Sequence, residues 1–139
     1  MIRAVLDTNV YVAALLSRRG APSQLVSALG EGLFDAVTCP QQLAELAGVL
    51  ARPKIAQHVS ADTARDFVAW LERVAVMVPD PLEVPPVSPD PDDDYLIALA
   101  RIGRARVMVS GDSHLLSVPD MEPRAIPPAE FAALVEGLR

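Results

Sequence analysis

Cysteine, histidine and lysine are scarce in this 139-residue chain. Cys39 is the single cysteine, so an internal disulfide is excluded and we expect a reducing, cytoplasmic environment. His58 and His114 are the only histidines. Lys54 is the only lysine, and the other 11 of the 12 basic residues are arginines. A disulfide-stabilised scaffold is therefore excluded.

Long hydrophobic runs are also missing. No uncharged run reaches the roughly 18–20 residues that a membrane-spanning helix needs, and Asp7 comes too early for the apolar region of a signal peptide. Hydrophobic residues make up 51% of the chain and charged residues 22%, which is typical of a globular protein. We expect one domain over residues 1–139 and no membrane partner.

Basic charge is in deficit, with 18 acidic residues against 12 basic ones and a net charge of −6. That balance argues against a protein that coats nucleic acid, because such proteins are basic. It does not exclude nucleic acid at one local site, because bound divalent cations can reverse the charge there.

Strand and helix patterns alternate along the chain. We expect strands at residues 2–7, 33–39, 74–79 and 106–110, and helices at residues 8–17, 21–32, 40–52, 60–75, 91–102 and 127–138. Six prolines between Pro79 and Pro91 predict an extended connector before the fifth of these helices. Strands separated by helices predict an α/β fold with a mostly parallel central sheet flanked by helices.

The stretch "PDPDDDYLIALA" places four aspartates within Asp90–Asp94, directly before an apolar helical pattern. Negative charge in the first turn of a helix complements its dipole, which accounts for one or two of these residues. It does not account for the whole run beside other acids, because converging carboxylates cannot all stay ionised without a counter-ion.

Further acids are predicted at the same edge of the sheet. Asp7 ends the first strand, Asp112 follows the strand that ends at Ser110, and Glu45 lies in the helix after the second strand. Taken singly, each has an ordinary structural interpretation: a helix cap, a turn residue and an exposed helical charge. Taken with Asp94, they could converge where parallel sheets bind ligands. Such hard oxygen ligands select Mg²⁺ or Mn²⁺, and a pair of these ions suits phosphodiester hydrolysis.

Four motifs in order, "VLDTN", "LAELAGVL" with Glu45, "DDDYLIALA" and "VSGDSHLL", resemble the PIN-domain family. The resemblance is strongest to the small VapC-like toxins of prokaryotic type II toxin–antitoxin pairs and covers nearly the whole chain. It implies a PIN-like three-layer fold and a Mg²⁺- or Mn²⁺-dependent endoribonuclease. It also implies an RNA substrate, a small antitoxin partner and a homodimer.

Carried over motif by motif, the resemblance implies catalytic and metal-binding roles for Asp7, Glu45, Asp94 and Asp112. Asn9 and Ser110 would orient them, and Asp92 and Asp93 would be accessory acids, because the triple aspartate run leaves its register open. Ser110 stands where the family usually has threonine. His114 stands where many members carry another acid, which leaves a fifth carboxylate in doubt and allows either a phosphate contact or a surface turn.

Other classes explain the sequence less well. A receiver-type phosphoacceptor needs a lysine near a late strand, and Lys54 lies before the middle helix. Haloacid-dehalogenase phosphatases need a second aspartate where Asn9 stands. A non-catalytic PIN-fold module that binds RNA or protein remains the alternative.

Two surface features predict partners. Phe67 and Trp70 widen the apolar face of the helix at residues 60–75, which suggests self-association, although both could be core residues. The candidates for RNA backbone contacts, each equally consistent with ordinary solvated surface, are Arg18, Arg19, Arg52, Lys54, Arg101 and Arg104.

Overall fold

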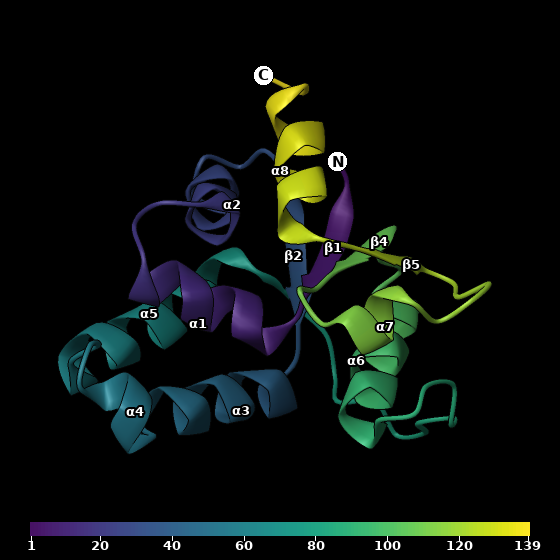
Figure 1. Ribbon diagram of the computed structural model, residues 1–139, viewed down its shortest axis with the longest axis horizontal. Coiled ribbons are helices and arrows are strands. Elements are labelled where there is room, and N and C mark those ends of the chain that lie inside the picture. The colour runs from purple at the N-terminus through teal and green to yellow at the C-terminus, as the bar shows by residue number, and fades with distance from the viewer.

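Five short parallel strands form the centre of the computed structural model, which describes residues 1–139 (Figure 1). In sheet order β3-β2-β1-β4-β5, the strands are Val76–Met77, Asp35–Thr38, Arg3–Leu6, Val107–Val109 and Arg124–Ile126. Every neighbouring pair is parallel. The predicted α/β fold with a mostly parallel sheet is therefore confirmed.

Eight helices surround these strands. In chain order from α1 to α8 they are Thr8–Leu16, Ala21–Gly30, Pro40–Leu50, Pro53–Ala56, Ala61–Val74, Pro91–Ile102, Ser113–Leu116 and Pro128–Glu136. Proline occupies one of the first two positions of α2, α3, α4, α6 and α8, where its missing N–H costs no helical hydrogen bond. None of the helices is long and apolar enough to cross a membrane.

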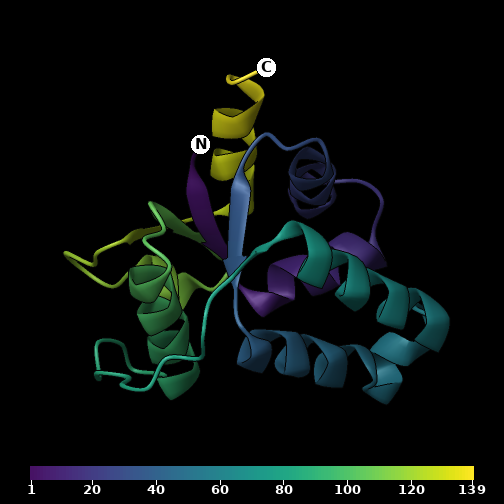
Figure 2. The same cartoon turned by 180° about the vertical axis from the view of Figure 1, so that it is seen from behind.

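Helices cover both faces of the sheet and make three layers (Figures 1 and 2). Side chains alternate along each strand, so Ala4 and Leu6 of β1 enter one core and Val5 enters the other. The larger core joins the sheet to α1, α2, α3, α5 and α8. The smaller core is formed mainly by α6, α7 and the segment that follows α7. The carboxyl ends of β1 and β4 consequently lie between the two helical layers.

Short elements differ from the sequence prediction. A strand was expected at residues 74–79, but β3 covers only Val76–Met77, because α5 continues to Val74 and Pro79 has no N–H to donate. The sequence pattern did not predict β5, α4 or α7. Each has only three or four residues, too few to establish a strand or helix periodicity.

The two aromatic residues of α5 pack within the subunit. Phe67 is buried at 9% exposure in the larger core, and Trp70 is partly buried against it. Their ring centroids lie 5.6 Å apart. Both aromatic residues therefore pack inside the subunit and do not support self-association. Self-association stays a prediction.

Candidate functional site

Two acids and a serine gather where β1 and β4 end. Leu6 pairs with Val109 in the parallel register, and the Asp7 amide donates to the Val109 carbonyl at 2.8 Å. Asp7 also caps α1, since its Oδ1 accepts a hydrogen bond from the Asn9 amide at 3.3 Å. The chain thus turns into α1 with the Asp7 carboxylate held at the edge of the sheet.

Ser110 joins the two strand-end acids. Its hydroxyl is fully buried, donates to Asp7 Oδ2 at 2.9 Å and accepts from the Asp112 amide at 3.0 Å. The Asp112 side chain in turn caps α7 by accepting from the His114 amide at 2.9 Å. The structure therefore places Asp7, Ser110 and Asp112 together, and His114 beside them on α7 with an exposed side chain.

Asp93, in the first turn of α6, is an aspartate whose charge interacts with those of Asp7 and Asp112. It is only 5% exposed, and its Oδ2 has no hydrogen-bond partner. Burial raises its pKa to about 6, and the charges of Asp112, Asp90, Asp7 and Asp92 add to the shift. A buried carboxylate oxygen without a donor, close to other carboxylates, is a position that a cation would satisfy.

The pKa of Asp7 is also raised. Burial raises its pKa above the usual range, the hydrogen bonds from Ser110 and Asn9 oppose the rise, and repulsion from Asp112 adds to it. No arginine or lysine forms a salt bridge with Asp7, Asp93 or Asp112. We refer to these three side chains as the acidic cluster.

The carboxylate of Asp94 accepts hydrogen bonds from the proline-rich connector. Its Oδ1 accepts the amide hydrogens of Val87 and Ser88 at 2.9 and 2.6 Å, which fastens the proline-rich connector onto α6. Burial alone would raise the pKa of Asp94, but these hydrogen bonds outweigh it and lower the pKa. Neither Asp7 nor Asp112 contributes to that shift. Asp94 therefore differs from Asp93, whose pKa shift includes the charges of Asp7 and Asp112.

Glu45 lies on α3 and is exposed. One turn earlier, buried Gln42 donates from Nε2 to the Leu6 carbonyl at 2.7 Å and accepts from Thr38 Oγ1 at 2.6 Å. These bonds hold α3 against the end of β1. The charge of Glu45 is felt by Tyr95 on α6, where it adds to an upward pKa shift caused first by burial. Glu45 on α3 therefore interacts electrostatically with α6. Its carboxylate has no hydrogen bond to the acidic cluster.

Asn9 and Asp92 are the remaining residues of the predicted set, whereas Asp90 was predicted to lie outside the site. Asn9 is exposed at the rim of a cavity of about 400 Å³ that Asp7 and Asp112 also line. Asp92 is exposed in the first turn of α6. Asp90 precedes it as the N-cap, with its Oδ1 accepting the Asp92 amide at 2.9 Å.

The donor set suits a hard divalent cation. It consists of carboxylates, with no cysteine and no histidine imidazole bonded into it, which favours Mg²⁺ or Mn²⁺. In the conformation described, no three acidic, histidine or cysteine side chains lie close enough to hold an ion together. The unpaired Asp93 oxygen fits the chemistry of such an ion.

Sequence reasoning missed Gln42 and Thr38, which hold the frame of the site. A threonine at the end of a strand with a glutamine four residues later is their only sequence signal, and many surface helices share it. The sequence also missed the contact between Cys39 Sγ and the Tyr95 hydroxyl, 2.8 Å apart, which links β2 to α6. The Cys39–Tyr95 contact joins residues that are distant in sequence. The role of Gln42 depends on the buried Leu6 carbonyl.

Comparison with known proteins agrees with this architecture. An uncharacterized protein of Methanocaldococcus jannaschii is 27% identical over 120 residues, which are 86% of this chain and 76% of the relative. A chain of the crystal structure of VapBC2 from Rickettsia felis, bound to a DNA fragment from their promoter, matches with a TM-score of 0.60 and 12% identity. That match covers 91% of this chain and 98% of the other, and at this identity it is a likeness of fold. Residues 3–114 match the family model of the PIN domain, and the chain therefore belongs to the PIN domain family.

Proposed function

We propose that residues 1–139 form a single PIN-like domain that is a Mg²⁺- or Mn²⁺-dependent endoribonuclease. The observation that carries the proposal is the buried, unpaired Oδ2 of Asp93 beside the hydrogen-bonded Asp7–Ser110–Asp112 unit. A structural acid would gain a donor partner, whereas this oxygen remains available to a ligand. Membership of the PIN domain family supports a nuclease rather than another use of carboxylates.

Asp7, Asp93 and Asp112 are the proposed ion ligands. Glu45 completes the set from α3, and Asp92 is accessory at the exposed end of α6. A divalent ion at this position would lower the pKa of an attacking water and offset charge on the leaving oxygen of the phosphodiester. Asp93 is proposed in place of Asp94 because the Asp94 carboxylate already accepts two backbone amides.

The other residues of the site have positioning roles. Ser110 holds the Asp7 carboxylate by its hydroxyl and fixes the backbone of Asp112 with the same oxygen. Asn9 lies at the rim of the cavity through which a phosphate would approach. This division of roles lets the carboxylates face a cation while the protein holds them in place.

We also propose that the chain is the toxin of a type II toxin–antitoxin pair in the cytoplasm. The fold likeness to a VapBC2 chain supports a small antitoxin partner. An arginine from such a partner could pair with the unneutralised carboxylates and exclude the ion. Expression of the chain without its partner should arrest growth, and Asp7→Asn should relieve the arrest.

Cleavage of a mixed RNA pool tests the enzymatic proposal. We expect cleavage with Mg²⁺ or Mn²⁺, none after EDTA, and none from Asp7→Asn, because the amide removes a charge and turns a donor toward the cation. Asp90→Asn is the matched control, since Asn caps a helix as well as Asp does. Cleavage that survives both EDTA and Asp7→Asn would reject the acidic cluster as the catalytic centre. RNA binding without cleavage would favour the non-catalytic PIN-fold binding module.

A further inference from the structure

Arginines occupy the edge of the sheet opposite the acidic cluster. Arg3 begins β1, Arg106 immediately precedes β4, and Arg124 begins β5. These are three adjacent parallel strands, so the arginines share the amino edge just as Asp7 and Asp112 share the carboxyl edge. At about 3.3 Å per residue, Arg3 and Asp7 are separated by roughly 13 Å along β1.

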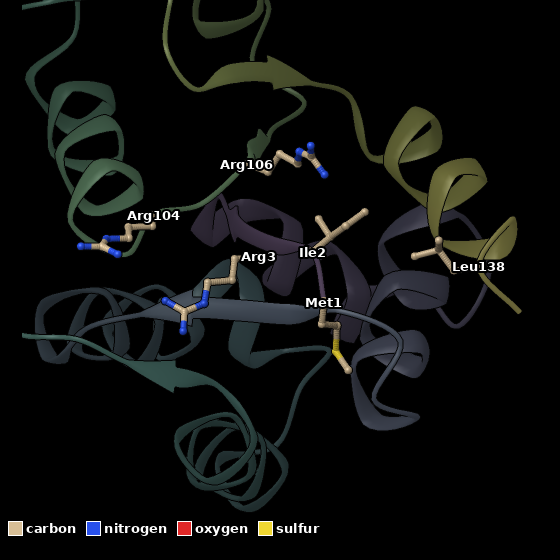
Figure 3. Close-up of a pocket in the computed structure, with 6 residues that line it drawn as sticks. All are labelled: Met1, Ile2, Arg3, Arg104, Arg106 and Leu138. Carbon is tan, nitrogen blue, oxygen red and sulfur yellow. The ribbon is translucent and has the colours of Figure 1, made fainter.

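A cavity of about 670 Å³ opens at this edge (Figure 3). It is lined by three arginines and three apolar residues, namely Arg3, Arg104, Arg106, Met1, Ile2 and Leu138. In Figure 3 the guanidinium groups of Arg3 and Arg104 point to the same side, next to the end of α6, and that of Arg106 lies apart from them near Ile2. The positive charges are thus spread along the cavity rather than focused on one point.

The three arginines of the cavity have no carboxylate partner. The salt bridges of the structure use Arg65 and Arg139 only. Arg139 neutralises Glu31 and Glu136, the acids of the neighbouring helical segments. Asp35, half-buried beside Arg3 in the β1–β2 register, forms no ion pair with it.

Local geometry holds part of this charge in place. Arg3 donates from Nη1 to the Gly103 carbonyl at 3.1 Å, which directs its guanidinium toward the end of α6. Arg104 adopts a left-handed backbone conformation with φ 55°, where the chain leaves that helix. Arg104 and Arg106 are exposed, so two of the three guanidinium groups face solvent without a partner.

We propose that this cavity is a second nucleic-acid site, which binds the phosphodiester backbone of single-stranded RNA away from the acidic cluster. Guanidinium groups bind phosphate oxygens through two parallel hydrogen bonds. Their spread suits successive phosphates of a strand better than one small anion, and the apolar lining offers contact to ribose and base. The site rests on the proposed function for its choice of RNA, and it gives a chain of net charge −6 one region that attracts a polyanion.

Fluorescence anisotropy with a labelled single-stranded RNA tests the site in EDTA at low salt. EDTA removes any divalent ion, so the acidic cluster repels RNA and the measured binding reports the arginine cavity. The test variant is Arg104→Gln/Arg106→Gln, which leaves Arg3 and its Gly103 bond intact. The charge-matched control is Arg65→Gln/Arg73→Gln, on exposed positions of α5.

We expect the test variant to bind RNA at least about tenfold more weakly, with a salt slope reduced by about 1.4, from two lost contacts at about 0.7 each. The control should change affinity by less than about twofold, since only long-range charge is altered. Equal losses in both variants, no RNA binding by the unaltered chain, or full displacement of RNA by 10 mM inorganic phosphate at constant ionic strength would each overturn the site. Both variants keep the acidic cluster, so the cleavage assay with Asp7→Asn tests the nuclease proposal separately.

Discussion

Asp93 and Asp94 are sequence neighbours whose carboxylates have opposite environments. Asp93 Oδ2 lacks any donor and lies among acids, whereas Asp94 Oδ1 accepts two backbone amides. We expect Asp93→Asn to reduce RNA cleavage to the level of the EDTA-treated enzyme. Asp94→Asn should retain most activity, because the Asn carbonyl oxygen can still accept the Val87 and Ser88 amides. The reverse ranking, measured as cleavage rates of the two variants, would return the ligand role to Asp94.

The raised pKa of Asp93 also predicts a pH-dependent stability. Its folded pKa is about 6 against a usual value of 3.8, so the folded state binds more protons than the unfolded state between these values. Stability of the metal-free protein therefore falls as pH rises from 4 to 6, and at pH 7.5 this charge costs about 1–3 kcal/mol. In urea unfolding with EDTA, Asp93→Asn should be more stable than the unaltered chain at pH 7.5 and equal to it near pH 4. A gain of the same size at both pH values would contradict this explanation.

Two buried tyrosines offer a matched pair. The Tyr11 hydroxyl is fully buried with no hydrogen-bond partner, so Tyr11→Phe removes an unsatisfied group and should raise stability by about 1 kcal/mol. The Tyr95 hydroxyl contacts Cys39 Sγ at 2.8 Å, so Tyr95→Phe should lower stability by about the same amount. Chemical denaturation of both variants measures the two signs, and a loss in Tyr11→Phe would show that its hydroxyl has a partner in solution.

At the scale of elements, Gly103 controls how α6 approaches the sheet. A Cβ added at Gly103 would collide with the Val37 side chain of β2, which is fully buried. Gly103→Ala should therefore cost about 1–3 kcal/mol of unfolding free energy through overpacking. Gly48→Ala is the control, because nothing lies near its added Cβ in the last turn of α3, and it should stabilise by up to about 0.5–1 kcal/mol. Thermal or urea unfolding of both variants tests the pair, and an unchanged stability in Gly103→Ala would mean that α6 can shift outward freely.

The longer elements could be predicted because their signals are local. Ser60 accepts a hydrogen bond from the Thr63 amide, as an N-cap should, and Pro91 begins α6. The strand-end acids were predictable for the same reason, since Asp7 and Asp112 follow recognisable strands. The different environments of Asp93 and Asp94 were not, because successive helical residues point about 100° apart and the amides of Val87 and Ser88 bond to Asp94 alone. Nor could β5 be predicted, because its three residues are too few to show a strand periodicity.

At the scale of the whole molecule, the homodimer remains a prediction. The α5 aromatics are used inside the subunit, but an apolar cavity of about 540 Å³ lies between α3 and α5 and includes Val68 and Ala69. If copies pair there, light scattering at micromolar concentration should give twice the monomer mass, and Ala69→Glu should return it to the monomer. A dimer that survives Ala69→Glu would place the interface elsewhere, and a monomer in the unaltered chain would reject self-association at this concentration.

The hydrogen bonds that frame the carboxyl edge lie wholly within the protein. Gln42 ties α3 to the Leu6 carbonyl, and Ser110 ties Asp7 to the backbone of Asp112. This frame exists before any ion arrives, so binding of Mg²⁺ would require the carboxylates to move closer together but would not require the chain to fold. Removal by a chelator should accordingly leave a cooperatively folded chain that regains its activity when the ion is returned. For the proposed nuclease, removal and return of the metal would then change activity without unfolding the chain.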